Sequence, residues 1–124
     1  MADAAQVSIP ANLALTDPVG VAQALIRLPS VSPDPGASQH LLAAMLERLG
    51  FEVTHLPLGE GAERTPNFFA RLGTGSPHLC YARPTAPVPP GAAAEWAHPP
   101  YPAHIVDGVS SAAVASVTRR GTCP

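Results

Sequence analysis

The side chains of this sequence best suited to metal or proton chemistry are its histidines, which number five. Imidazole nitrogens bind zinc and related ions when ligands recur at short spacing, as in H-x-x-x-H or in combination with C-x-x-C. No such arrangement occurs here. The five are His40, His55, His78, His98 and His104, and metal binding by them is not predicted. We expect solvent-facing or structural roles for His55 and His78, and loop-surface positions for His98 and His104.

Other catalytic patterns are equally absent. There is no G-x-S-x-G elbow for a serine nucleophile. The two-glycine pieces at 59–61 and 73–75 lack the third glycine or the lysine of a phosphate-binding loop, and they indicate turns. Glu60 and Glu63 are close in sequence, but they lie in a stretch that we expect to be an exposed loop. No catalytic, cofactor-binding or metal-ligating residue is predicted.

A proline-rich stretch offers the remaining functional pattern. The chain has 16 prolines, and they concentrate after Ser76. Pro84-Thr85-Ala86-Pro87 is a P-x-x-P tetrapeptide that could adopt polyproline II and bind an aromatic groove. Chance occurrence in a proline-rich tract is the favoured interpretation.

Two helices are expected before residue 50. Thr16 or Asp17 can cap the first, with Pro18 at its first position and Pro29 ending it. Its apolar stripe is Val19, Ala22, Leu25, Ile26 and Leu28. A second helix is predicted over 37–49, ending at Gly50. One face of that helix carries Leu41, Leu42, Met45, Leu46 and Leu49.

Three strands are expected to follow, over 51–56, 67–72 and 78–82. This order predicts an α/β or α+β fold, with two helices packed on a partial mixed sheet and an irregular proline-rich C-terminal part. Residues 1–15 form a loose leader in this prediction, residues 16–109 the folded part, and residues 110–124 an irregular tail. Three strands and two helices hardly close a core, which indicates the first portion of a larger unit.

Composition excludes several classes of partner. A chain of 124 residues with a net charge of −2 and no lysine gives no electrostatic reason to expect nucleic acid or an anionic membrane. The two cysteines, Cys80 and Cys123, make a poor disulfide framework. We expect a reduced, cytoplasmic protein with neither a signal peptide nor a membrane span.

From Asp17 to Gly108 the sequence resembles the succinyl-diaminopimelate desuccinylase family of the zinc aminoacylase/carboxypeptidase superfamily. The resemblance rests on the order and spacing of many short pieces. They are Asp17-Pro18-Val19, Ala24–Pro33, Leu49–Val53, Pro66–Gly73, Pro77–Ala82, Val88–Gly91, Trp96, His98–Tyr101 and Ile105–Gly108. The Trp-x-His-Pro-Pro-aromatic segment favours the desuccinylase branch over general aminoacylases.

This resemblance implies that residues 16–109 are a truncated N-terminal part of a zinc-hydrolase catalytic domain. The family hydrolyses N-succinyl-diaminopimelate to succinate and diaminopimelate, in lysine and cell-wall synthesis, using two zinc (or cobalt) ions. The family is homodimeric, and the dimerisation domain has no counterpart here. Its first metal ligand, a His, and a supporting Asp correspond to Pro84 and Ala86, where the family's Gly-His-Thr-Asp-Val is replaced by residues 83–87. Neither residue can bind zinc.

A damaged reading frame would explain these departures. His to Pro and Asp to Ala each require one A-to-C change, and reading the codons after Val109 one base earlier can give the family's Leu-Phe-Gly-Arg-Gly. We hypothesise local substitutions, a frameshift near residue 110 and an early stop. Two functional interpretations follow: an inactive part of a metal-dependent amide hydrolase, or a non-catalytic decayed product or proline-rich interaction segment.

Overall fold

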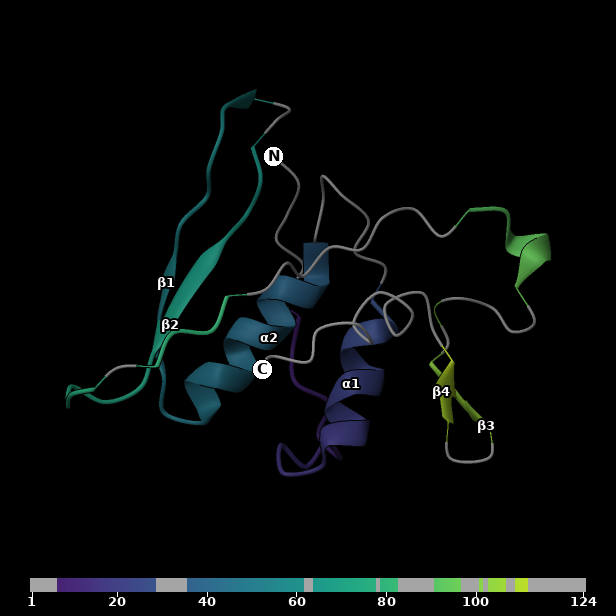
Figure 1. The fold of residues 1–124 in the computed structure, drawn as a ribbon, viewed down its shortest axis with the longest axis horizontal. Helices are drawn as coiled ribbons and strands as arrows, with labels where there is room; N and C mark the ends of the chain where they lie inside the picture. Colours follow the sequence, from purple (N-terminus) through teal and green to yellow (C-terminus); the bar gives the residue numbers. More distant parts are fainter. Residues whose placement is uncertain are drawn as a thin grey trace.

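The computed structural model describes residues 7–28, 36–61, 64–77, 79–82, 91–96, 101, 103–106 and 109–111. Two helices come first along the chain, followed by two pairs of strands with a 3-10 turn between the pairs, a mixed α and β composition (Figure 1). In order, they are α1 (Pro18–Ile26), α2 (Gly36–Arg48), β1 (Glu52–His55), β2 (Phe68–Arg71), the 3-10 turn η2 (Ala93–Glu95), β3 (His104–Val106) and β4 (Val109–Ser111). Val7–Leu15, in the predicted leader, forms turns without helix or strand.

Helix α1 begins where the sequence predicted, and the structure decides which residue caps it. Asp17 has extended backbone geometry, and its Oδ1 accepts a hydrogen bond from the Val19 amide at 3.0 Å. Pro18 follows in the first turn, where its missing N–H leaves nothing unsatisfied. The cap satisfies one of the free amides that every helix start leaves exposed.

The predicted apolar stripe of α1 is only partly covered. No residue of this helix is buried, and Val19 is 50% exposed. The reason is that α1 packs on α2 and lies one layer away from the sheet. The expectation that both helices pack on the sheet is therefore wrong for α1.

Helix α2 supplies most of the core. Its buried side chains include Leu41, Ala43 and Met45. Gly50 follows the helix at φ +91, a left-handed conformation that glycine adopts without strain, as its predicted role at the helix end requires. Leu49 departs from the predicted stripe: it lies in the terminal turn after Arg48 and is 51% exposed.

Strands β1 and β2 form an antiparallel hairpin that packs against α2 (Figure 1). Thr54 pairs with Phe69, and the pairing continues beyond the strands, because the Leu56 amide donates to Asn67 O at 2.7 Å and Leu58 bridges to Thr65. Both predicted strands are thus present, slightly shortened. In the part of the chain that the structure describes, the sheet pairing is antiparallel throughout, so the predicted mixed sheet is not observed there.

The third predicted strand does not form. Residues 79–82 have no regular secondary structure, and Leu79 and Tyr81 are 97% and 77% exposed. Their apolar pattern has strand character, but a strand is stable only when a neighbour satisfies its backbone groups. Among the described residues no strand pairs with this segment.

A second hairpin, β3–β4, was not predicted. It is antiparallel and joins His104–Val106 to Val109–Ser111, so it includes the first two residues of the predicted tail. The Gln23 side chain of α1 donates from Nε2 to the Ala103 carbonyl at 3.0 Å. Ala103 is almost fully buried and has φ +52, a conformation that is unfavourable for a residue with a Cβ. One long-range hydrogen bond therefore ties this hairpin to α1.

We predict that Asp17→Ala lowers the free energy of unfolding by about 1 kcal/mol, because the amides at the start of α1 lose their side-chain acceptor. Asp17→Asn keeps an acceptor oxygen and is the matched control. Urea denaturation followed by far-UV circular dichroism measures both. Equal destabilisation by the two variants would show that the charge, and not the cap, matters.

Gln23→Met should destabilise the protein by about 1–3 kcal/mol, because it leaves the Ala103 carbonyl without its donor at nearly unchanged side-chain volume. Val19→Met, at an exposed position of the same helix, controls for the added methionine. Amide hydrogen exchange of β3 and β4 should rise in the Gln23 variant alone. Unchanged exchange in both variants would contradict the role given to this bond.

Candidate functional site

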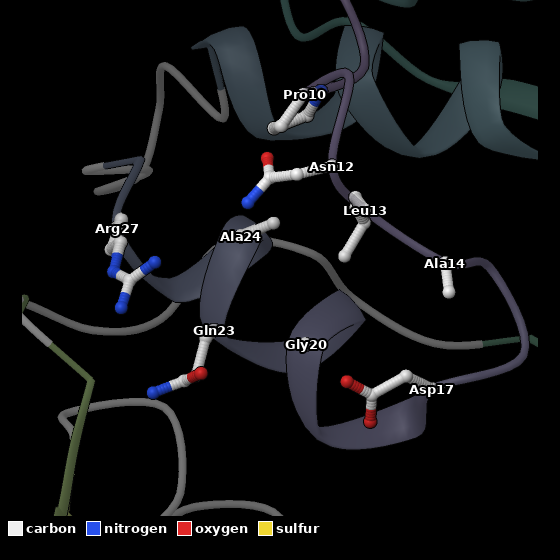
Figure 2. Close-up of a pocket in the computed structure, with 9 residues that line it drawn as sticks. All are labelled: Pro10, Asn12, Leu13, Ala14, Asp17, Gly20, Gln23, Ala24 and Arg27. Carbon is white, nitrogen blue, oxygen red and sulfur yellow. The ribbon is translucent and has the colours of Figure 1, made fainter.

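A cleft between α1 and the preceding turn is lined by described residues. It has a volume of about 240 Å³ and is open to solvent (Figure 2). Its lining combines apolar groups with one carboxylate and one guanidinium. The lining residues are Pro10, Asn12, Leu13, Ala14, Asp17, Gly20, Gln23, Ala24 and Arg27.

Two polar side chains of this cleft form hydrogen bonds that stabilise the fold. Asp17 lies at the start of α1 and caps it (Figure 2), and the Gln23 amide donates a hydrogen bond to the Ala103 carbonyl. Gly20 leaves room for the cap, since a Cβ there would lie 2.6 Å from Asp17 Oδ2. Asp17 and Arg27 are ten residues apart, roughly 15 Å along a helix, too far to act on one reacting group. The cleft holds no acid–base pair and no nucleophile.

The structure brings two of the histidines together, which their sequence spacing did not indicate. His40 on α2 and His55 at the end of β1 have ring centroids 5.9 Å apart, and His55 also lies 6.4 Å from the Phe68 ring. Both histidines are exposed, in line with the surface role expected for His55. The contact arises because α2 packs across the hairpin, a tertiary relation that no local pattern encodes.

The remaining candidates fall into two groups. Glu60 is exposed in a turn whose flanking glycines have positive φ, and Cys80 is exposed with a free thiol, so neither lies in an enclosed pocket. The other positions lie outside the described residues or have side chains that are not described. They are Glu63, His78, Pro84, Thr85, Ala86, Pro87, His98, His104 and Cys123.

The donor set does not fit a metal centre. Within the described ranges, no three side chains of His, Cys, Asp or Glu gather closely enough to hold an ion. None of the described helices is long and apolar enough to cross a bilayer. That positions 84 and 86 hold no metal stays a prediction from their side chains.

Comparison with characterised proteins identifies the relatives of this chain. It is 52% identical over 95 residues to the succinyl-diaminopimelate desuccinylase of Gluconacetobacter diazotrophicus, a match covering 77% of this chain and 24% of that protein. The enzymes of the same name from Gluconobacter oxydans and Rhodospirillum centenum are 50% and 43% identical over 93 residues. The chain is a relative of the succinyl-diaminopimelate desuccinylases.

The resemblance to desuccinylases expected from the sequence is therefore confirmed. No family model matches the chain. The chain spans about a quarter of the length of each desuccinylase relative.

We predict that the purified chain retains less than one zinc ion per molecule after incubation with Zn²⁺ and desalting, as measured by elemental mass spectrometry. Chelation should leave its thermal unfolding unchanged, because a structural zinc site would couple metal loss to unfolding. A His40→Gln/His55→Gln variant separates weak surface binding by these imidazoles from any other site. One chelator-resistant zinc per chain that survives in that variant would contradict the prediction.

Proposed function

We propose that residues 16–109 are a scaffold portion of a metal-dependent amide hydrolase domain of the succinyl-diaminopimelate desuccinylase type, and that this chain alone does not catalyse the reaction. The observation that carries the proposal is the identity of 41–52% to four desuccinylases, sustained over about three quarters of the chain. The reaction of the complete domain would be hydrolysis of N-succinyl-diaminopimelate to succinate and diaminopimelate.

The local structure supports a scaffold role. A hydrolase domain built of helices and strands needs a sheet covered by helices. The β1–β2 hairpin with α2 packed against it supplies one such unit. The helix caps, the strand register and the Gly50 turn are all in order, so this part of the sequence retains what folding requires.

The residues at the expected metal-binding positions support the proposal that this chain alone does not hydrolyse the substrate. Amide hydrolysis needs a polarised carbonyl and an activated water, which the family obtains from metal ions, and metal binding needs side-chain donors. Pro84 and Ala86 have none. The cleft beside α1 offers no substitute, because its only carboxylate, Asp17, accepts the capping hydrogen bond. No step through a metal is therefore assigned to this chain.

A chimera tests both halves of the proposal. Residues 17–108 would replace the matching segment of the Gluconacetobacter diazotrophicus enzyme, either unchanged or with Arg83→Gly, Pro84→His, Ala86→Asp and Pro87→Val. We expect the unchanged chimera to be inactive, with kcat/KM for N-succinyl-diaminopimelate reduced at least 1000-fold. The restored chimera should regain hydrolysis to within about tenfold of the parent enzyme, because the scaffold is shared.

Two results would contradict the proposal. Hydrolysis by the isolated chain above the rate of a heat-denatured sample would refute its inactivity. A restored chimera that folds, with the circular dichroism and melting temperature of its parent, yet hydrolyses nothing would refute the scaffold role. The parent enzyme with the reverse changes at the matched positions is the control for loss of activity.

A further inference from the structure

We propose that His40 and His55 form a two-imidazole binding site for a divalent cation such as Ni²⁺, Cu²⁺ or Zn²⁺, and that the bound ion links α2 to the β1–β2 hairpin. The site goes beyond the proposed function, because it involves neither the hydrolysis reaction nor positions 84 and 86. It rests on the short distance between the two rings, on their exposure and on the two different elements that carry them.

The register of the hairpin explains why His55 faces α2. Residues of a strand point alternately to its two sides, and directly paired residues share a side. His55 pairs with Phe68 and follows Val53 by two residues, so these three side chains share one side. Phe68 and Val53 are partly buried, and α2 is packed against both strands (Figure 1). His55 therefore extends from the side of the hairpin that α2 covers.

The lengths of the two elements bring His40 to the same place. Helix α2 leads through the Gly50 turn directly into β1, so the two elements run in opposite directions (Figure 1). The helix rises about 12 Å from His40 to Arg48. The strand runs about 10 Å from Glu52 to His55, a similar distance from the turn. The two imidazoles are therefore at the same level of the packed pair.

The distance between the two rings suits a shared ion. Their centroids are 5.9 Å apart, and the ring planes are tilted by 39°. A zinc–imidazole bond of about 2.0–2.1 Å places a ring centroid about 3.2 Å from the ion, and two centroids about 5 Å apart at a tetrahedral angle. Both side chains are exposed, so their rotation is not blocked by packing. A movement of about 1 Å therefore brings one nitrogen of each ring to bonding distance.

The donor set decides which ions fit and how firmly they are held. Imidazole nitrogen suits nickel, copper and zinc, whereas magnesium and calcium take oxygen ligands. Within the described ranges, no third His, Cys, Asp or Glu lies close enough to join the pair. Water molecules would therefore complete the coordination sphere. A structural zinc centre has four protein ligands, so a site with two exchanges its ion with solution and fills only while free ion is present.

Ion binding at this pair stabilises the folded chain. The two histidines are fifteen positions apart in the sequence, and the packing of α2 on the hairpin brings them together. In the unfolded chain, the same pair can share an ion only after closing this loop, which loses chain entropy. A ligand that prefers the folded state raises the folded fraction as its concentration rises. The bound ion therefore strengthens the contact between α2 and β1.

Urea denaturation of the full chain with and without Ni²⁺ tests this site. We expect about 1 mM Ni²⁺ to raise the ratio of folded to unfolded protein roughly tenfold or more. Mg²⁺ at the same concentration should leave the ratio unchanged, because it prefers oxygen ligands. Equal stabilisation by the two ions, or no stabilisation by Ni²⁺, overturns the proposal.

A double-mutant cycle shows whether the two imidazoles act as one site. His40→Gln, His55→Gln and the double variant should lose the stabilisation by Ni²⁺ to the same extent, because a shared ion needs both ligands. Additive losses would indicate separate binding to each imidazole and overturn the proposal. His98→Gln is the matched control for removal of one imidazole and should keep the full effect. Loss of the effect in this control also overturns the assignment.

Chemical modification of the unsubstituted protein gives a second readout that does not depend on the folding of variants. Diethyl pyrocarbonate reacts with accessible imidazoles, and peptide mass mapping follows each histidine separately. The same Ni²⁺ concentration should slow the reaction of His40 and His55 together, roughly tenfold. Protection of only one of the two, or of neither, overturns the proposal. Neither readout involves hydrolysis, so the site is judged separately from the proposed function.

Discussion

The packing of α2 across the β1–β2 hairpin is the contact on which the rest of the described structure depends. Leu41, Ala43 and Met45 are the buried apolar side chains of this layer, each 2–3% exposed. Among the described elements, helix α1 packs mainly on α2. The same helix, α2, packs against both strands of the hairpin. Such a small core explains why so much apolar surface remains exposed elsewhere.

Short sequence signals correctly predicted the helix ends and the first strand. Asp17 and Pro18 mark the start of α1, and Gly50 marks the end of α2. The alternation of apolar and polar residues over 51–56 marks a strand. Each of these signals acts within a few residues of the chain. The mistakes share a cause. The segment of Leu79 has strand-like residue types but forms no strand in the described part, and Val19 has an apolar side chain that stays half exposed.

The candidate site shows the same division between local and non-local information. The proximity of His40 to His55, and of Gln23 to Ala103, follows from tertiary packing and left no signature in sequence spacing. The resemblance to desuccinylases, by contrast, was predictable because many short pieces occur in order, and the relatives confirm that resemblance. That the family's metal ligand and its supporting carboxylate correspond to Pro84 and Ala86 stays a prediction from the sequence.

The hydrogen bond from Gln23 to Ala103 also bears on the order in which the chain folds. It joins residues 80 positions apart, so forming it closes a long loop, and that closure loses chain entropy before any contact compensates for it. The hairpin of β1 and β2 and its contact with α2 involve much closer neighbours. Folding should therefore begin with α2 and the first hairpin and finish when Ala103, just before β3, reaches Gln23 of α1. In the folded protein, this late contact is the one expected to open first.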